Sequence, residues 1–266
     1  MGDLKSSLYF GLANWGTPGY NEFHETMPLP LSDNVVEVWV VDLQASRQRV
    51  EYAFQLLSDD ERHRAEQFRF PVHRDRFVMA RASLRRILAT YFEIEPTQLA
   101  FRYSEYGKPS LVTPQTDIRF NVSRSHDKAI IACSRGREIG VDTERIRRDL
   151  DVDDLAQRFF SVAENDRLRE VPPNFRHLAF LRCWTCKEAF VKAVGMGLSF
   201  DLDKFDVSVA LSNPAAFLSA STQEFTVNGW SLIAFGTAAV EGHVSAVVTR
   251  GAEVNKLSLS VRPWPQ

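Results

Sequence analysis

The sequence predicts an α+β fold built as a pseudo-dimer, in which two similar halves enclose a cleft. The first reason is the order of the elements, because helices and strands in residues 35–136 are followed by helices and strands in a similar order in residues 137–266. The second is the length of 266 residues, which allows two halves that each bury a core. We place the seam near Arg135. Ligands commonly bind between such halves, so we expect the functional site in the cleft.

Residues 1–34 precede the first predicted element. They are rich in Gly, Pro, Asn and small polar residues and have no sustained period. We interpret them as an N-terminal arm, with Phe10 and Trp15 as candidate anchors.

In the first half, alternating apolar residues in "VVEVWVVDL" predict a strand over residues 35–43. Ser58 and Glu61 have capping-box spacing, so a helix should start there. Pro71 interrupts this helix, and a longer one resumes near Arg74. The apolar residues of the longer helix recur near helical spacing, at Phe77, Leu84, Ile87, Leu88 and Tyr91.

The middle of the chain predicts strands joined by tight turns. "YGKPSL" is a turn, residues 118–125 are a strand that runs into a loop, and residues 128–134 are a buried strand. "RGRE" forms the next turn, and residues 139–144 should return along the preceding strand as a hairpin.

The second half predicts a helix over residues 155–168, a proline-containing loop and a helix over residues 176–194. Several strands follow and end at Val261. This order resembles that of the first half, although no close sequence repeat is visible.

Composition narrows the class of protein. Apolar residues make up 44% of the chain and charged residues 25%, which is typical of an ordinary globular protein. A formal net charge of −2 argues against a broad nucleic-acid-binding surface. No apolar run approaches the roughly 20 residues of a membrane helix, and three cysteines make no disulfide framework. We therefore expect a reduced, cytoplasmic protein.

Asp142 and Glu144 are the first candidates for chemistry. Side chains at positions i and i+2 of a strand share a face, so the two carboxylates should project together. They repel each other unless a cation lies between them, and hard oxygen ligands suit Mg²⁺. Most pairs of this kind lie on solvated strand faces. Here the pair follows an apolar strand and a tight turn, which favours a ligand site at the end of a strand.

The helix in "CWTCKEAFVKAVG" carries the second set. At 100° per residue, Trp184, Lys187, Glu188, Val191 and Lys192 fall within an arc of about 140°. A face that served only the core would be apolar, but this one carries an acid between two lysines. The alternative is a surface Glu188–Lys192 pair that contributes a few tenths of a kcal/mol.

A scattered basic and hydroxyl set comes from the first half. Lys108 lies on the "YGKP" turn, and "FNVSRSHD" places three polar residues after a strand. Each of these residues could be an ordinary surface residue, but together they suit phosphate groups. The chain has no GxxxxGK[ST] loop, which argues against a P-loop enzyme. The set consists of Lys108, Ser123, Arg124, His126, Arg64 and Arg76.

Two other patterns favour structural explanations. Cys183 and Cys186 form a C-x-x-C, but they lie within a strongly helical stretch and only Cys133 remains as a further thiol, so we interpret them as buried small apolar residues. The charged run "RIRRD" at residues 145–149 is typical of a solvated loop or of a surface that faces a partner.

"GVDTE" followed by "WTCKEAFVKAVGMGL" resembles the paired signature of the 4'-phosphopantetheinyl transferases of the surfactin-synthetase-activating (Sfp-like) type. "YGKP", "FNVS", "RFF" (residues 158–160) and "DLDKF" (residues 201–205) occupy the positions at which that family has similar stretches. The resemblance covers roughly residues 35–250. It implies a pseudo-dimer with the active site in the cleft between the halves.

The resemblance also implies a reaction. Mg²⁺ would be held between the diphosphate of coenzyme A and the acids Asp142, Glu144 and Glu188. The phosphopantetheine arm would pass to a serine of an apo carrier protein, with release of adenosine 3',5'-bisphosphate. Glu188 would take the serine proton directly or through water, Lys192 would contact the phosphates, and Lys187 would orient the site.

Coenzyme A contacts are expected from both halves. Residues 35–136 would hold the 3'-phosphate and adenine side, and residues 137–266 would carry the metal, the catalytic residues and the carrier-docking surface. The implied coenzyme A-binding residues are Arg64, Arg76, Gly107, Lys108, Pro109, Asn121, Ser123, Arg124, Asp142 and Lys192.

One departure from the family pattern leaves two alternatives. The family has Ser-His after its "FN" motif, with the imidazole near the 3'-phosphate of coenzyme A, whereas this chain has Ser123-Arg124-Ser125-His126. Arg124 could replace the histidine as a permanently charged donor. Alternatively the loop is shifted and His126 serves.

The expected partners are apo acyl, peptidyl or aryl carrier domains of polyketide or nonribosomal peptide synthases, and we expect a monomer. Phe159, Phe160, Met196 and Leu198 are candidates for a carrier-facing patch, although both phenylalanines could belong to the core. The alternative function is a pseudoenzyme that binds coenzyme A or a carrier protein without turnover. It would be favoured if one metal acid were missing, and none is.

Overall fold

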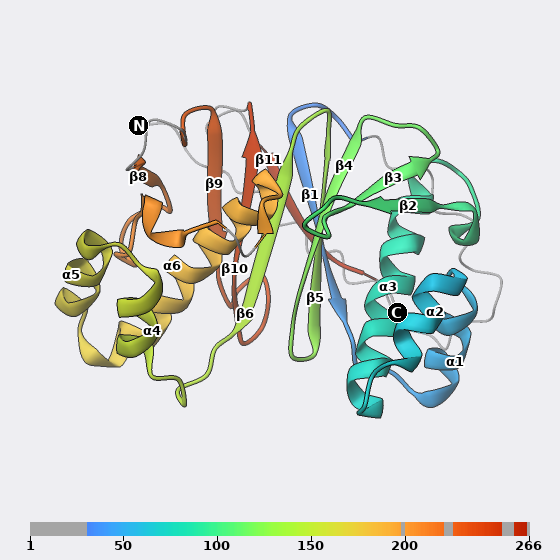
Figure 1. Cartoon of the computed structure of the whole chain (residues 1–266), viewed down its shortest axis with the longest axis horizontal. Helices are drawn as coiled ribbons and strands as arrows, with labels where there is room; N and C mark the ends of the chain where they lie inside the picture. The colour runs from blue at the N-terminus through green and yellow to red at the C-terminus, as the bar shows by residue number, and fades with distance from the viewer. Residues whose placement is uncertain (1–30, 198–199, 221–225, 252–257, 265–266) are drawn as a thin grey trace.

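The computed structural model describes residues 31–197, 200–220, 226–251 and 258–264. Two lobes of helices and strands lie side by side, and strands from both lobes meet in the middle (Figure 1). The predicted α+β pseudo-dimer is confirmed. The candidate anchors Phe10 and Trp15 fall outside the described residues. The last part of the predicted arm does contact the fold, since Leu31 is buried and its carbonyl accepts a hydrogen bond from Arg135 Nε at 2.9 Å.

The first lobe packs three helices on one face of a sheet whose strand order is β11-β1-β5-β4, in which β11 (Ser258–Pro263) comes from the end of the chain. The period-2 alternation of β1 explains this packing. Trp39 and Val41 join the core under the helices, whereas Val36 and Val38 point to the other face. The elements are β1 (Val35–Asp42), α1 (Arg47–Gln55), α2 (Asp59–Glu66), α3 (Pro71–Thr90), η2 (Pro96–Gln98), β2 (Ala100–Tyr103), β3 (Pro109–Thr113), β4 (Ile118–Ser125) and β5 (Lys128–Arg135).

The second lobe packs a long helix, α6, on a sheet whose order is β6-β10-β9. Its elements are β6 (Ile139–Arg145), α4 (Val152–Phe159), α5 (Val162–Glu170), α6 (Pro173–Val194), η4 (Leu202–Lys204), β7 (Phe205–Val207), β8 (Phe217–Ala220), β9 (Trp230–Phe235) and β10 (His243–Arg250). No helix in the described residues is long and apolar enough to span a membrane.

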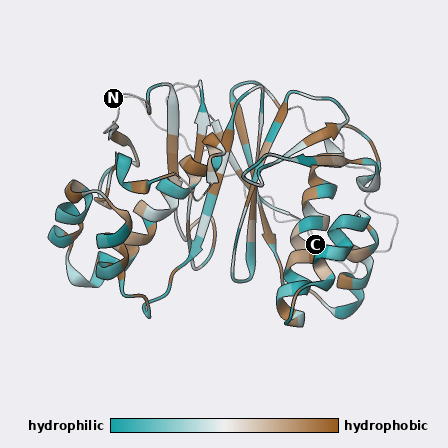
Figure 2. Ribbon diagram, viewed as in Figure 1, coloured by the Kyte–Doolittle hydropathy of each residue, from teal (hydrophilic) through white to brown (hydrophobic). Residues whose placement is uncertain are grey.

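A third core joins the two sheets. The inward faces of β1 and β5 contribute Val38 and Ile130, and β6 and β10 contribute Val141 and Val247, all buried. Figure 2 shows the corresponding apolar colour along the central strands. The apolar contact between the sheets holds the lobes together and sets β4 beside β6.

Several elements differ from the sequence predictions. The predicted hairpin is wrong, because β6 does not pair with β5 but antiparallel with β10, with Val141 opposite Val247. Residues 258–263 form β11, which pairs in parallel with β1. The chain therefore returns to the sheet of the first lobe, so the last residues of the predicted second half, 137–266, belong to the first lobe. Helix α1 is not anticipated by the sequence analysis.

The helix boundaries also differ. The long first-lobe helix begins at Pro71 rather than near Arg74, because proline is favourable in the first turn, where its missing N–H is not needed. The helix predicted over residues 155–168 is two helices, since Phe160 is extended and Ser161 caps α5. The three cysteines are buried and free.

A buried ion pair recurs in the two lobes. In α2, Glu61 completes a capping box with Ser58 and accepts from Arg85 of α3 at 2.6 Å. In α5, Glu164 completes a capping box with Ser161 and pairs with a lysine of α6, Lys187, at 2.8 Å. All four charged side chains are at most 2% exposed. Each pair fixes a short helix to the long helix of its lobe.

Gly140 sets the distance between β6 and α6. A Cβ built on Gly140 would lie 2.0 Å from the carbonyl oxygen of Ala189 and 2.3 Å from the amide nitrogen of Ala193. Both are backbone atoms of the helix, so no side chain can move aside. The missing side chain at Gly140 therefore lets α6 lie directly on β6, next to Asp142.

We expect Gly140→Ala to lower the free energy of unfolding by about 1–3 kcal/mol, because the added methyl pushes α6 off β6. Thermal and urea unfolding measure this loss. Gly236→Ala is the matched control, since its Cβ would meet nothing within 4 Å. A Gly140→Ala protein as stable as the Gly236→Ala protein would contradict the close approach.

Candidate active site

The seam between the lobes is built from side chains of β4 that accept hydrogen bonds from the backbone of β6. Asn121 Oδ1 accepts from the Val141 amide at 3.0 Å. Two residues on, Ser123 Oγ accepts from the Thr143 amide at 3.3 Å. Ser125 Oγ then accepts from the Arg145 amide at 3.0 Å. Alternate residues of β4 thus bridge to alternate residues of β6, as the strand period requires.

The same two serines hold the predicted acids. Ser123 Oγ donates to Asp142 Oδ1 at 2.8 Å, and Ser125 Oγ donates to Glu144 Oε2 at 2.8 Å. A hydroxyl can donate one hydrogen bond and accept others, so each serine serves the seam and a carboxylate together. Asp142 and Glu144 therefore lie on one face of β6, as the sequence predicts. The intervening Thr143 instead bonds Ser245.

Helix α6 supplies the groups opposite these acids. Lys192 Nζ lies 2.6 Å from Asp142 Oδ1 and donates to Ser123 Oγ at 3.0 Å. Glu188 is one turn earlier and half-buried. Burial raises the pKa of Glu188, and Asp142 and Glu144 raise it further, while Lys192 opposes them. Burial and then Asp142 also raise the pKa of Glu144. The acids of the two elements therefore interact electrostatically.

The carboxylates are of the chemical type that a hard cation prefers. Asp142 is 3% exposed, and its Oδ2 is buried without a hydrogen-bond partner. Oxygen donors that repel one another suit Mg²⁺, which usually takes one or two protein carboxylates and completes its shell with water and substrate phosphates. In the described part of the chain, no three His, Cys, Asp or Glu side chains are arranged to hold a metal by themselves. The donors thus fit a shared site better than a closed cage.

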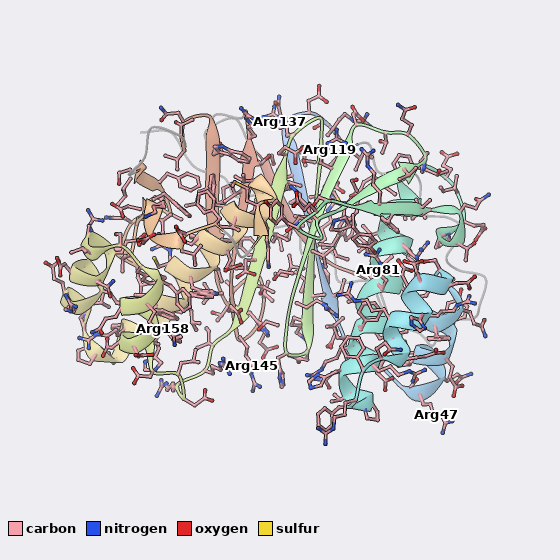
Figure 3. The ribbon with its side chains drawn as sticks, viewed as in Figure 1. Arg47, Arg81, Arg119, Arg137, Arg145 and Arg158 are labelled. Atoms are coloured by element: carbon pink, nitrogen blue, oxygen red, sulfur yellow. The ribbon has the colours of Figure 1, made fainter. Side chains whose placement is uncertain are left out.

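A cavity of about 470 Å³ extends from the seam into the first lobe. Glu144 lines it on one side, and Leu43 and Phe68 contribute apolar walls. Most of the remaining lining is basic: His73, Arg76, Arg124, His126, Arg145 and Arg147. Figure 3 labels Arg145 at the lower end of β6, between the lobes. The cavity can therefore take an anionic ligand.

Arg124 has the environment of an anion-binding group. Its guanidinium lies 5.5 Å from the centre of the Phe77 ring, and Arg64 lies 5.5 Å from the same ring. Arg124 keeps part of its surface exposed, but desolvation of its guanidinium lowers its pKa, and Arg64 and Arg81 lower it further. All of these influences oppose its positive charge, which an anion would stabilise.

His126 is arranged differently. Its Nε2 lies 3.0 Å from Arg145 Nη1. An arginine can only donate, so this contact requires an unprotonated Nε2. Desolvation lowers the pKa of His126, and Arg145 and Arg76 lower it further. His126 is therefore held neutral beside the cavity.

Two family models match the chain. A 4'-phosphopantetheinyl transferase N-terminal model matches residues 42–136, and the 4'-phosphopantetheinyl transferase superfamily model matches residues 138–247, so the models meet where β5 leads into β6. The 4'-phosphopantetheinyl transferase HetI of Nostoc sp. is 36% identical over 217 residues, which cover 79% of this chain and 88% of that protein. The chain belongs to the 4'-phosphopantetheinyl transferase family.

Two relatives from Bacillus are more distant. The 4'-phosphopantetheinyl transferase psf-1 of Bacillus pumilus is 29% identical over 170 residues, covering 64% of this chain and 71% of that protein. The 4'-phosphopantetheinyl transferase Sfp of Bacillus subtilis is 27% identical over 167 residues, covering 63% and 73%. These matches support the family but do not single out the Sfp-like type.

One predicted catalytic residue lies elsewhere in this transferase. Lys187 is fully buried on the side of α6 away from Asp142, where it pairs with Glu164 and donates to the carbonyls of Leu202, at 2.7 Å, and Phe205. The Lys187 ammonium therefore does not face the carboxylates of the site but ties α6 to α5. Lys187 and Lys192 are 140° apart around the helix, and only Lys192 faces β6.

The implied coenzyme A residues divide into three groups. Arg76 and Arg124 line the cavity, and Arg64 contacts the same Phe77 ring as Arg124. Ser123, Asp142 and Lys192 meet at the seam. Asn121 is buried, and its side-chain oxygen is used by the Val141 amide. Gly107, Lys108 and Pro109 lie at the tip of the β2–β3 hairpin, where Lys108 Nζ donates to Ala193 O of α6 at 2.7 Å.

The candidate residues of the carrier-facing patch differ in how deeply they are buried. Phe160 belongs to the core and stacks on Phe180 with ring centres 5.1 Å apart, so its proposed surface role is wrong. Phe159 is partly buried against Trp184, and Met196 is 40% exposed. Leu198 falls outside the described residues.

Sequence reasoning missed Ser125, Arg145 and Arg147. The signal for Ser125 is present, because Asn121, Ser123 and Ser125 recur at every second residue of β4. Nothing local signals the other two, since "RIRRD" resembles any charged loop.

Glu188→Gln should stabilise the ligand-free transferase at neutral pH. A carboxyl whose pKa is raised on folding destabilises the folded state once both states are ionised, and this penalty fades as the pH falls toward its ordinary value of about 4.3. We therefore expect the Tm of Glu188→Gln to exceed that of the wild type at about pH 8 and the gap to narrow toward about pH 5. Scanning calorimetry in the presence of a chelator measures both. The matched control is Glu170→Gln, an exposed position. A gap that stays constant with pH would rule out the assigned repulsion.

Proposed function

We propose that the chain transfers the 4'-phosphopantetheine group of coenzyme A to a serine of an apo carrier protein and releases adenosine 3',5'-bisphosphate. One observation carries the proposal. At the seam of a member of this family, Asp142 and Glu144 face Glu188 and Lys192 at the edge of a basic cavity. Carboxylates that could bind one cation together therefore lie next to a basic surface that could bind phosphate groups. A pseudoenzyme would be favoured by a missing acid, and all three are present.

Asp142, Glu144 and Glu188 are the residues that would hold Mg²⁺. The free Oδ2 of Asp142 and the raised pKa values of Glu144 and Glu188 support this assignment. When bound, Mg²⁺ supplies neutralisation of the diphosphate charge. The two serines that donate to Asp142 and Glu144 leave the other oxygen of each carboxylate for a ligand.

The remaining chemistry belongs to α6. Glu188 would accept the proton of the carrier serine, directly or through water, and its raised pKa brings its basicity closer to neutral pH. Lys192 is placed to contact phosphate oxygens, because its ammonium already lies at the acids and is 30% exposed. When the bond between the two phosphates breaks, negative charge develops on the 5'-phosphate of the leaving adenosine 3',5'-bisphosphate, and this ammonium would stabilise it.

Arg124, with Arg64 and Arg76, would bind the 3'-phosphate of coenzyme A. A guanidinium can donate to two phosphate oxygens at once, and the shared position of Arg124 and Arg64 at Phe77 gives a two-arginine anion site. His126 is the weaker candidate because its contact with Arg145 keeps it neutral.

We further propose that the protein acts as a cytoplasmic monomer of the Sfp-like type, on acyl, peptidyl or aryl carrier domains of polyketide or nonribosomal peptide synthases. The arrangement of two lobes in one chain and three buried free thiols support this assignment. Met196, beside the end of α6, is the described residue that best fits a carrier contact. Mass spectrometry of a panel of apo carriers incubated with coenzyme A and Mg²⁺ tests the carrier range.

We expect Asp142→Asn to lower kcat for carrier modification on the order of 100-fold or more, because it removes a ligand charge while keeping the side-chain volume. Intact-mass measurement of the carrier over time gives the rate, and circular dichroism checks the fold. Asp59→Asn, at an exposed aspartate of α2, is the control. Near-wild-type turnover of Asp142→Asn at saturating Mg²⁺ would remove Asp142 from the metal site.

Arg124→Ala should weaken coenzyme A binding about 10- to 100-fold, the range of a charged hydrogen bond. It should have little effect on 3'-dephospho-coenzyme A, which lacks the phosphate. His126→Ala should change neither affinity by more than about twofold. Calorimetric titration of both variants with both ligands measures this. A phosphate-dependent loss in His126→Ala alone would show that the loop is shifted by two residues.

A further inference from the structure

The tip of the β2–β3 hairpin in the first lobe lies on the end of α6 in the second. The tip spans residues 104–108 and is closed by two backbone hydrogen bonds, Ser104 N to Lys108 O and Gly107 N to Ser104 O, both 2.9 Å. Ser104 Oγ accepts from the Lys108 amide at 3.1 Å, and Gly107 takes a φ of +78°. The tip is therefore well defined in itself. Figure 1 shows it reaching across the seam toward α6.

Two glycines after α6 receive this tip. Gly195, the C-cap, has a φ of +80°, and a Cβ there would lie 3.3 Å from Lys108 Cδ. Gly197 has a φ of +62°, and a Cβ there would lie 3.1 Å from Tyr106 Cβ. The "GMG" turn is thus open where the stem of Lys108 and the ring of Tyr106 lie. The motifs "YGKP" and "GMGL", which are about 90 residues apart, contact each other.

Lys108 places a positive charge at the C-terminal end of α6. Its ammonium donates to Ala193 O at 2.7 Å and to Glu138 Oε2 at 3.1 Å. Ala193 O is among the last carbonyls of α6, which have no partner within the helix, and a cation there also meets the negative end of the helix dipole. Glu138 lies in the linker between β5 and β6, so the contact ties the hairpin, the linker and the helix together.

The bonded carbonyl is adjacent to the candidate active site. Ala193 directly follows Lys192, whose ammonium lies 2.6 Å from Asp142. The last turn of a helix frays easily when its carbonyls have no partner. A loss of the Lys108 contact would therefore loosen the turn that carries Lys192, while Glu188, one turn earlier, remains on β6.

We propose that the hairpin tip is a latch between the lobes, in which Lys108 and Tyr106 hold the last turn of α6 so that Lys192 stays on the acids of β6. Lys108 is then a positioning residue and not a coenzyme A ligand. The inference rests on the proposed function, because it gives Lys108 a role at the same site.

Lys108→Met tests the latch, since it keeps the stem over Gly195 and removes the charge. We expect kcat for carrier modification to fall about 10-fold through misplacement of Lys192, with the Kd for coenzyme A within about twofold of the wild type. Lys108→Arg should recover most of kcat, because it restores a donor. Lys204→Met, at a lysine that pairs with Asp203, is the control and should match the wild type.

Hydrogen exchange supplies a readout that does not need activity. In Lys108→Met, amides of residues 191–195 should exchange faster than in the wild type, while those of β10 should not change. Tyr106→Ala, which truncates a half-exposed side chain, should give the same local effect. This variant replaces Lys108→Met in the test if Lys108→Met does not fold.

Three other outcomes would contradict the proposed latch. A loss of coenzyme A affinity equal to the loss of kcat would make Lys108 a ligand, and a lower Tm with unchanged kcat would make the contact merely structural. Unchanged exchange at residues 191–195 would show that the tip does not hold the helix. A wild-type protein that modifies no carrier would overturn the proposed function itself, and the exchange measurement would still decide the latch.

Discussion

The hydrogen bonds from β4 side chains to the β6 backbone are the constraint on which the site depends. Both strands are edges of their sheets, and an edge strand presents unpaired N–H groups. Asn121, Ser123 and Ser125 satisfy three of those groups on β6. Because the bonds run through side chains, two hydroxyl hydrogens remain available for carboxylates. Direct backbone pairing would leave no such donors at this position. Ser123 and Ser125 therefore join the two lobes and position the acids at the same time.

The charges at this joint form an acidic group and a basic group. The acids lie on β6 and α6, and Lys192 partly offsets their repulsion. The arginines that line the cavity come from both lobes, with Arg76 and Arg124 on α3 and β4 and Arg145 and Arg147 at the end of β6 and just after it. Neither group is favourable alone: burial and like charges raise the pKa of Glu144 and Glu188, and desolvation and then positive neighbours lower the pKa of Arg124. A ligand that brings phosphates to one side and a cation to the other relieves both strains. The proposed binding of a diphosphate together with a divalent ion rests on this balance.

The two lobes share a buried ion pair that supports the long helix, and they differ in the other residues that this helix carries. Glu61 with Arg85 and Glu164 with Lys187 are the same device, a capping-box glutamate held by a buried cation of the long helix. Buried pairs of this kind tolerate the loss of one partner poorly, because the remaining charge has no compensation. Lys187 therefore belongs to the support of its helix. The face of α6 that meets β6 carries the residues of the site, and Gly140 sets how closely that face approaches.

Local sequence determined which residues share a face, and the tertiary structure decided which faces meet. The strand period places Asp142 with Glu144, and helical spacing places Glu188 with Lys192, because these relations depend only on neighbours along the chain. The same spacing could not exclude Lys187, since only the packing of α6 shows which edge of its polar arc faces β6. The pairing of β6 with β10 instead of β5 likewise depends on the apolar contact between the sheets, which joins residues about 100 positions apart. Lys108 shows the same limit: its sequence motif marks a turn, and its partner, a helix carbonyl 85 residues away, exists only in the folded chain.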